Sequence, residues 1–290
     1  MSTETESTLA VTSVLPGIYH DMPNDTYHGT SAISNTGLRN LAKSPFHFYS
    51  LHRDPSRPPQ AAKPGQLEGT LAHCAVLEPL QFSNRYVIGP DVRANTNEWK
   101  AFVERHRAKT VIKADQHEAA HAQARSVRQI ADVAELLSAG HAEVSAYWNE
   151  DLVDALTGES TRVLCRCRPD WVHPVNDDSV ILVDLKTCSD ASPWEFARQI
   201  KRKSYHGQNA FYKRGYEKAT GKKVLGFVFV AVESAWPHAS APVMLNDSDV
   251  EQGDAQNQRL LQLYVKCMAE DTWPSYTQSI VPVSIPNYSN

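Results

Sequence analysis

The chain has 290 residues, a formal net charge of −4 and 41% hydrophobic residues, which is ordinary for a globular protein of one large or two small domains. The negative charge argues against a protein that coats nucleic acid non-specifically, and no apolar run approaches the ~20 residues of a membrane span. Five cysteines favour a reducing compartment over a disulfide framework. The first residues lack the pattern of a signal peptide, so we expect a cytoplasmic protein with a loose N-terminal tail.

The predicted elements alternate between helices and strands, which indicates an α/β fold with a central mixed sheet flanked by helices. We expect one domain over residues 16–280, with tails at 1–15 and 281–290. The first half predicts a helix near Thr36–Ala42 capped by Ser34 or Asn35, a loop over 53–65, a helix from about Gly69 to just before Pro79, and mainly helical residues 95–140. The second half predicts a strand over 142–148, a strand pair over 161–187, a basic helix from about Pro193 to Ala219, a strand over 224–233 and an amphipathic helix over 249–271.

One apolar run contains an acidic and a basic residue two positions apart. Residues 180–187, Val-Ile-Leu-Val-Asp-Leu-Lys-Thr, are typical of a buried strand. Side chains two residues apart on a strand share a face, so Asp184 and Lys186 are expected to project together from its end. Charges are costly at such a place without a use. The carboxylate could bind a divalent metal, and the neighbouring ammonium could contact a water or a phosphate. Together they indicate a metal-dependent nuclease site.

A second carboxylate, Asp170, lies just upstream of this strand. Residues 161–172 alternate with a period near two, and His173–Ser179 have turn chemistry, so the two runs are expected to pair as an antiparallel hairpin. The hairpin places Asp170 opposite or diagonal to Asp184, with Cβ atoms about 5–8 Å apart. Two carboxylates at this separation can share one hard cation, because Mg²⁺ binds oxygen ligands at about 2.0–2.1 Å.

Two helical motifs flank the carboxylates in the sequence. His73 follows Gly69 by one turn and is either a core histidine with one hydrogen bond or a contact for a metal or phosphate. Gln208 and Tyr212 are four residues apart and therefore share one helix face, which is either a plain helix surface or part of the site.

A basic segment follows the carboxylate strand. Between residues 198 and 223 there are nine basic residues, opposed only by Glu217. Such a segment is either a solvated helix face or a contact for a phosphate backbone, and the neighbouring carboxylates favour DNA contact. The residues expected to contact DNA are Arg198, Lys201, Arg202, Lys203 and Lys213, and the remaining four are Arg214, Lys218, Lys222 and Lys223.

In order and spacing, these motifs resemble the RecB-like branch of the PD-(D/E)xK nuclease superfamily. The flanking sequence, over roughly residues 15 to 280, is similar to the nuclease domain of RecE-type exonucleases (exodeoxyribonuclease VIII), which phages and prophages encode. The segments that carry this resemblance are Gly17–His20, Tyr27–His28, Ser34–Leu38, Lys43–Tyr49, Gly69–Pro79, Asp170, Asp184–Lys186 and Gln208–Tyr212. The resemblance implies a PD-(D/E)xK, restriction-endonuclease-like core.

The resemblance also implies roles for individual residues. The implied catalytic set is His73, Asp170, Asp184, Lys186, Gln208 and Tyr212. The implied ligands of Mg²⁺, or Mn²⁺, are Asp170, Asp184, the backbone carbonyl of Leu185 and His73. Glu143 begins a predicted strand and is either a further acidic residue facing the metal or a surface glutamate. Lys186 would orient the attacking water or stabilise the developing negative charge, and Gln208 and Tyr212 would place the substrate and brace the lysine.

The implied activity is that of a magnesium-dependent exodeoxyribonuclease. It would digest linear double-stranded DNA from 5′ to 3′ and leave 3′ single strands for a RecT-like annealing protein in a bacterial host. The resemblance further implies a homo-oligomeric ring, with a tetramer favoured. An endonuclease of the same superfamily and a non-catalytic DNA-binding subunit on the same fold are the alternatives, because the motifs do not separate end-dependent from internal cutting.

No ATP and no iron–sulfur cluster are expected. The segment 215–222 superficially resembles a phosphate-binding loop, but its glycines are one residue too far apart and no Ser or Thr follows Lys222. Iron–sulfur nucleases of this branch carry cysteines near both ends of the domain, whereas this chain has only Cys267 late in its sequence.

Overall fold

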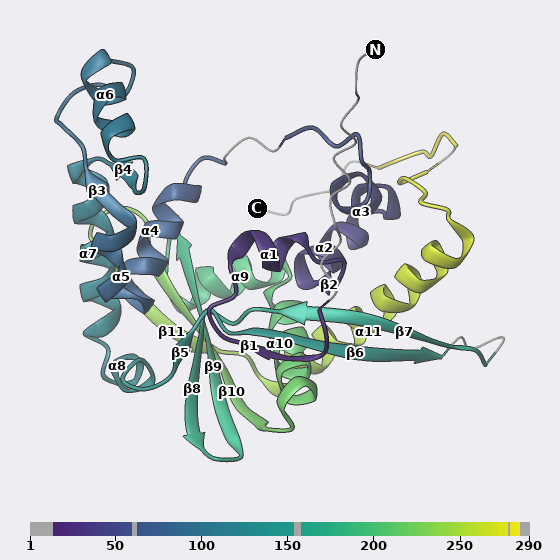
Figure 1. Ribbon diagram of the computed structural model, residues 1–290. Coiled ribbons are helices and arrows are strands. Elements are labelled where there is room, and N and C mark those ends of the chain that lie inside the picture. The colour runs from purple at the N-terminus through teal and green to yellow at the C-terminus, as the bar shows by residue number, and fades with distance from the viewer. Residues whose placement is uncertain (1–13, 60–62, 154–157, 278, 285–290) are drawn as a thin grey trace, which may run out of the picture.

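The computed structural model describes residues 14–59, 63–153, 158–277 and 279–284 (Figure 1). The predicted tails therefore lie largely outside the described residues. The helices are α1 (Asn24–Gly29), α2 (Asn35–Lys43), α3 (Pro45–His52), α4 (Gln66–Leu77), α5 (Pro79–Arg85), α6 (Asn97–Arg105), α7 (Ala114–Arg128), α8 (Ala131–Leu136), α9 (Pro193–Lys203), α10 (Tyr205–Thr220) and α11 (Asp247–Glu270). No helix among the described residues combines the length and the apolar composition needed to cross a bilayer.

The strands form a central sheet of mixed direction and two smaller sheets. They are β1 (Gly17–Tyr19), β2 (Ile33–Ser34), β3 (Tyr86–Ile88), β4 (Thr110–Ile112), β5 (His141–Ala142), β6 (Ser145–Val153), β7 (Ser160–Cys167), β8 (Trp171–Asn176), β9 (Ser179–Cys188), β10 (Lys223–Glu233) and β11 (Ser240–Met244). The central sheet has the order β11-β10-β9-β8-β5, in which β9 and β10 are parallel and the other pairs antiparallel. The second sheet has the order β1-β6-β7-β2, and β3 pairs with β4. The predicted α/β fold with a mixed sheet flanked by helices is confirmed.

Helices cover both faces of the central sheet because the apolar residues of its middle strands face alternate sides. Val183 and Leu185 of β9 pack with α4 and α7, whereas Val180 and Leu182 pack with α9 and α10. Side chains of this size contribute about 1.5–3 kcal/mol each when fully buried. Figure 1 shows α4, α5, α7 and α8 gathered on one side of this sheet, with the β6–β7 hairpin extending away on the other side.

The predicted hairpin exists, but its first strand is shorter than expected. Residues 161–172 are not one strand: β7 ends at Cys167 in the second sheet, and β8 begins at Trp171 in the central sheet. Pro169 stands between them, and a proline cannot donate to a strand ladder, so the chain changes sheet there. Most of the predicted turn is strand, and β8 and β9 are joined at residues 177–178. Trp171 pairs with Val183, which places Asp170 opposite Asp184, as predicted.

The predicted basic helix is two helices. Ser204 adopts the left-handed conformation (φ 55°) between α9 and α10, so the residues on either side no longer share one axis. Of two other predictions about helix starts, one is confirmed and one differs slightly. The cap of α2 is Ser34, whose Oγ accepts from the backbone N–H of Gly37 at 3.2 Å, as predicted. The helix of His73 begins at Gln66 rather than near Gly69.

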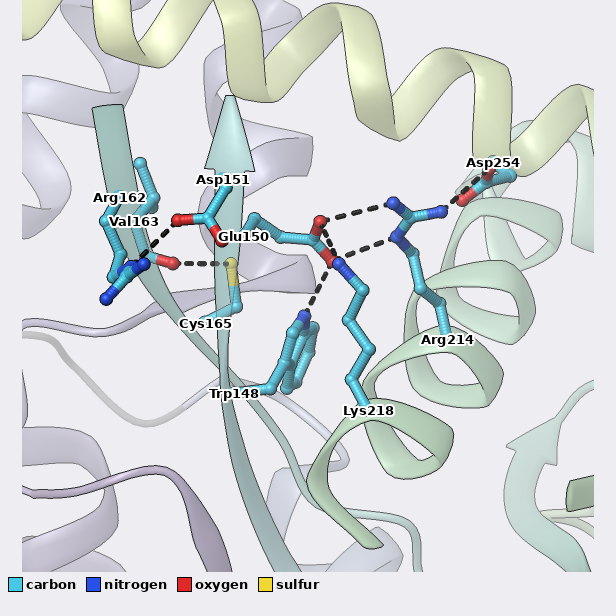
Figure 2. A network of polar contacts seen from close by, with 9 residues as sticks. All are labelled: Trp148, Glu150, Asp151, Arg162, Val163, Cys165, Arg214, Lys218 and Asp254. Carbon is cyan, nitrogen blue, oxygen red and sulfur yellow. Dashed lines mark hydrogen bonds and ion pairs between the residues drawn. The ribbon is translucent and has the colours of Figure 1, made fainter. Parts of the chain in front are cut away.

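A buried ion network ties β6 to α10 and α11 (Figure 2). Glu150 is only 2% exposed, and its carboxylate accepts from Trp148 Nε1 (2.8 Å), Arg214 Nε (2.9 Å) and Lys218 Nζ (2.6 Å). Arg214 also lies 3.6 Å from Asp254 on α11. Burial alone raises the pKa of Glu150, but the hydrogen bonds from Arg214, Lys218 and Trp148 outweigh it and hold the pKa below its ordinary value.

Replacing Glu150 with alanine is expected to lower the free energy of unfolding by about 2 kcal/mol, because the Trp148 indole loses its acceptor while the half-exposed Arg214 and Lys218 recover water. Since the pKa of Glu150 is lowered by folding, its contribution is present at neutral pH and is lost as the pH falls through the folded-state value. Denaturant unfolding at pH 7 and at acid pH measures both effects. Asp151→Asn is the matched control, because the Asp151–Arg162 pair is exposed; an equal loss there would contradict a specific role for the network.

Candidate active site

Three potential metal ligands from distant parts of the chain meet at one end of the central sheet. They are His73 on α4, Glu143 in the link between β5 and β6, and Asp170 just before β8, and one ligand atom from each lies within 4.8 Å of the others. His73 Nδ1 is 3.5 Å from Asp170 Oδ2. Glu143 is held by its backbone, which is left-handed (φ 52°) and donates its N–H to the carbonyl of Asp170 at 3.0 Å. A turn of the chain therefore brings Glu143 to Asp170.

Asp184 and Lys186 form an ion pair beside this group, on the face of β9 that packs against α10. The side chain of Asp184 is 1% exposed, and its Oδ1 accepts from Gln208 Nε2 at 2.5 Å. The residue between them, Leu185, donates its backbone N–H to Asp170 Oδ2 at 2.7 Å. Lys186 thus contacts Asp184, and the intervening Leu185 contacts Asp170, because successive residues of a strand point to opposite faces.

The electrostatics of the group follow from burying several carboxylates together. Burial raises the pKa of Glu143 to about 8, and the negative charge of Asp170 adds to this effect. Burial also raises the pKa of Asp184; Lys186 opposes the shift and Asp170 reinforces it. For Lys186, burial alone lowers the pKa, but the charges of Asp184 and Asp170 outweigh it and raise the value. Lys186 therefore stays a cation, while the carboxylates repel one another.

The donor set fits a hard divalent cation. Carboxylate oxygens with one imidazole suit Mg²⁺ or Mn²⁺, and the self-repulsion that raises the pKa of Glu143 is what a bound cation would relieve. Two ligand atoms on the same Mg²⁺ are at most about 4.2 Å apart. The ligand atoms of the three side chains lie within 4.8 Å of one another, so small side-chain rotations would bring them to that distance. His73, Glu143 and Asp170 would hold the ion, and Asp184 faces Lys186 and Gln208.

Because the pKa of Glu143 is raised, we expect the folded protein to lose stability as the pH rises. A bound cation should relieve this loss. Between pH 4.5, where an ordinary glutamate ionises, and the folded-state pKa of about 8, the folded protein binds more protons than the unfolded chain and loses stability as the pH rises. In EDTA, Glu143→Gln should therefore melt above the wild type at pH 8, by a wider margin than at pH 5. Saturating Mn²⁺ should reverse the order at pH 8. A variant that melts below the wild type in EDTA at both pH values would contradict this electrostatic picture.

Gln208 and Tyr212 were both expected to brace Lys186, but neither of them contacts its amine in the structure. Gln208 contacts Asp184, the partner of Lys186, rather than Lys186 itself. The ring beside Lys186 belongs to Tyr205, whose centroid is 5.0 Å from Nζ, and not to Tyr212. Tyr212 is half-buried on the same helix and its ring centroid lies 6.1 Å from that of Phe227. Tyr205 was missed because it lies outside the Gln-x-x-x-Tyr spacing.

A cleft of about 1280 Å³ reaches the acidic group from the side of α2 and α9. Its one acidic lining residue among the described residues is Glu143. Its charged rim carries Arg39, Lys43, Arg57, Lys63, Arg202 and Lys203. The carboxylate group therefore lies at the edge of a hollow whose other charges are positive, as a polyanionic substrate requires.

Only part of the predicted basic segment lines this cleft. Arg202 and Lys203, at the end of α9, do so. Arg198 and Lys201 on the same helix are exposed outside it, and Lys213 on α10 does not line it. Within the segment Glu217 is the only acidic residue, but a carboxylate from outside the segment also opposes its charge. The buried carboxylate of Glu150, from a strand far away in the sequence, binds both Arg214 and Lys218, so these two cations are not free for a ligand.

Four of the cations on the rim were not identified from the sequence. They come from α2 and from the residues before α4, which lie more than 100 positions ahead of α9. Arg39 and Lys43 are four residues apart and share a face of α2, which was the available signal. Without the tertiary fold, nothing in the sequence indicates that this face opposes the end of α9.

Comparisons with known proteins agree with this fold. Among the curated proteins, none matches the chain. A candidate exonuclease from Eubacterium rectale has a similar crystal structure, with a TM-score of 0.58 at 10% identity over 88% of this chain and 91% of that chain, which shows a shared fold. An alkaline exonuclease from Laribacter hongkongensis also matches, with 15% identity over 67% of this chain and 98% of that chain, but its TM-score of 0.23 carries no argument. A family model described as a PDDEXK-like domain of unknown function (DUF3799) matches residues 34–281, so the chain belongs to this family of the PD-(D/E)xK nuclease superfamily.

Proposed function

We propose that the protein is a metal-dependent deoxyribonuclease that hydrolyses phosphodiester bonds in the cleft. The observation that carries this proposal is the meeting of His73, Glu143 and Asp170 within 4.8 Å, beside the ion pair of the buried Asp184 and the half-buried Lys186. Carboxylates that can hold a divalent ion next to a fixed cation are the groups that phosphodiester hydrolysis needs. The structural likeness to a candidate exonuclease supports the fold on which this chemistry would run.

The surroundings of each residue indicate its role in the proposed reaction. A divalent ion, when bound, supplies Lewis-acid chemistry that neutralises charge on the scissile phosphate and acidifies a water. Lys186 is a half-buried cation whose pKa is raised by Asp184 and Asp170, and it therefore acts by stabilising negative charge that develops on the phosphate, not by removing a proton. Asp184 fixes the position of Lys186, and Gln208 fixes Asp184 by its hydrogen bond.

DNA is the substrate that the rim of the cleft favours. Each lysine or arginine that contacts a phosphate releases a counterion and contributes about 0.9 to the logarithmic salt slope on B-DNA. The double variant Arg202→Ala/Lys203→Ala is therefore expected to weaken binding to duplex DNA about tenfold and to reduce the salt slope by about 2. Fluorescence anisotropy over a salt series in EDTA measures both quantities.

Arg198→Ala/Lys201→Ala is the matched control for this pair. It removes the same charge from the same helix, outside the cleft, so the salt slope should change by much less. If the control weakens binding as much as the cleft variant, the contact surface is the whole basic helix and not the cleft.

We further propose that the activity is a RecE-type exonuclease. The motif order and the flanking segments support digestion of linear duplex from the 5′ end, which leaves 3′ single strands for a RecT-like annealing protein. Mg²⁺ is the proposed metal, and a ring, with a tetramer favoured, is the proposed assembly, since an enzyme without a motor stays on its substrate best by enclosing it.

One digestion experiment tests these points together. Linear duplex labelled at one 5′ end or the other, and the same sequence as a closed circle, are incubated with Mg²⁺ or with EDTA. The proposal expects release of the 5′ label from linear DNA in Mg²⁺ only, with the circle intact. Cutting of the circle would identify an endonuclease, and no cleavage of either substrate would identify a non-catalytic DNA-binding protein.

A further inference from the structure

The aromatic ring of Tyr205 lies against the amine of Lys186. The ring centroid is 5.0 Å from Lys186 Nζ, which is within the range of a cation–π contact. The lysine side chain is 18% exposed and Tyr205 is 8% exposed, so both groups are largely removed from water. Cation–π contacts are stronger when they are desolvated, and this one therefore adds to the ion pair between Lys186 and Asp184.

Aromatic neighbours hold the ring of Tyr205 in place. It stacks on Phe229 of β10, with centroids 5.8 Å apart and planes inclined by 23°, and Phe196 of α9 lies 6.3 Å away. Tyr205 is also the first residue of α10, directly after the left-handed Ser204 that sets the direction in which this helix begins. The flexible stem of Lys186 therefore meets a rigid partner.

The first turn of α10 contacts both members of the ion pair. Tyr205 and Gln208 are three residues apart and share a helix face. Gln208 Nε2 donates to Asp184 Oδ1 at 2.5 Å, while the ring of Tyr205 lies beside the amine of Lys186. One helix turn thus fixes the carboxylate by a hydrogen bond and the ammonium by an aromatic ring.

A ring suits this position because it attracts the ammonium without neutralising it. A second carboxylate here would compensate the remaining charge of Lys186 and add to the repulsion among the carboxylates of the site. The ring has no net charge, so the ammonium keeps its charge for an approaching phosphate. Lys203, which lines the cleft, also lies 5.9 Å from the ring centroid, so the ring contacts one cation of the ion pair and one of the rim.

We propose that Tyr205 is a positioning residue for the reaction: its ring holds the ammonium of Lys186 where it meets the negative charge that develops on the scissile phosphate. This proposal rests on the nuclease function proposed above. Tyr205 does not line the cleft, so its contribution passes through Lys186. Losing the ring should therefore slow the chemical step and leave DNA binding nearly unchanged.

Tyr205→Leu and Tyr205→Phe separate the ring from the hydroxyl. Leucine removes the ring, and the single-turnover cleavage rate at saturating DNA is expected to fall about ten- to thirtyfold, as the loss of one desolvated cation–π contact allows. Phenylalanine keeps the ring, so its rate should stay within about threefold of the wild type. The Kd for duplex DNA, measured by fluorescence anisotropy in EDTA, should change by less than about threefold in both variants.

A double-mutant cycle with Lys186→Met shows whether the effect passes through the lysine. In the Lys186→Met background, Tyr205→Leu should lower the rate by less than about threefold, because the amine that the ring holds is already gone. A purely structural role of Tyr205 would lower the rate by the same factor in both backgrounds. Tyr216→Leu is the matched control: Tyr216 is buried to a similar degree on the same helix (7% exposed), and its loss should leave the cleavage rate of the folded protein unchanged.

A second measurement locates the amine without any reaction. In protein labelled with ¹³C in its lysine side chains, the ring current of Tyr205 should shift the ε-methylene signal of Lys186 upfield of the other lysines. This signal is identified by its absence from the Lys186→Met spectrum. The upfield shift should persist in Tyr205→Phe and be lost in Tyr205→Leu.

The outcomes separate this proposal from the one that it rests on. Cleavage by Tyr205→Leu at the wild-type rate, an equal loss in both backgrounds, or a wild-type Lys186 signal without an upfield shift would overturn the positioning role and leave the nuclease intact. An upfield Lys186 signal that depends on the ring, in a wild-type protein that cleaves no DNA in Mg²⁺ or Mn²⁺, would overturn the nuclease and support the hold of Tyr205 on Lys186.

Discussion

Asp170→Asn is expected to lower the rate of DNA cleavage by at least about 10³-fold while leaving the protein folded and able to bind duplex DNA. Asparagine has the same shape as aspartate, and its Oδ1 can still accept the N–H of Leu185. The substitution removes the charge of the one carboxylate that contacts both His73 and the β9 strand. Mn²⁺ affinity, measured by calorimetric titration, should fall together with the single-turnover cleavage rate.

Asp178→Asn is the control for this variant. Asp178 is an exposed aspartate in the turn of the same β8–β9 hairpin, so the same chemical change there should leave cleavage and Mn²⁺ affinity at wild-type values. An Asp170→Asn variant that is folded by circular dichroism and still cleaves DNA within about tenfold of the wild type in Mg²⁺ would contradict the proposed role of Asp170 in metal binding.

Lys186→Met is expected to separate chemistry from metal binding. The methionine fills the space of the lysine stem but removes the cation that lies against Asp184 and over Tyr205. Losing a preorganised charge beside a developing oxyanion lowers the rate by about 10²–10³-fold. Because the ammonium of Lys186 repels a divalent ion nearby, Mn²⁺ affinity should stay the same or increase when it is removed.

Single-turnover cleavage and Mn²⁺ titration on the same preparation test this separation. Lys201→Met, an exposed lysine on α9 outside the cleft, controls for the substitution itself. A Lys186→Met variant that loses Mn²⁺ binding would show that the lysine supports the metal site's structure, and not the reaction alone.

The sequence predicts the parts of the site that lie close together along the chain. The alternation in residues 180–187 correctly places Asp184 and Lys186 on one face, because a strand has a fixed period of two. The turn chemistry after Val172 correctly predicts an antiparallel partner for this strand, and the pairing of Trp171 with Val183 follows. Local geometry is sufficient for these two predictions.

Contacts between distant segments could not be predicted in the same way. The split of residues 161–172 between two sheets depends on which strands lie beside them, and β1 and β2, from the start of the chain, supply part of the second sheet. The approach of Glu143 to Asp170 depends on a left-handed residue that local pattern does not mark. Glu150 removes Arg214 and Lys218 from the basic segment through a contact across 64 and 68 positions of sequence.

The position of a bound metal ion tests the central claim most directly. Crystals of the protein soaked in Mn²⁺ give an anomalous difference map that locates the ion without reference to any assumed site. We predict a peak about 2.0–2.3 Å from a carboxylate oxygen of Asp170, with Glu143 or His73 as a second ligand. A protein that cleaves DNA in Mn²⁺ while its peak lies elsewhere, away from these three side chains, would contradict it.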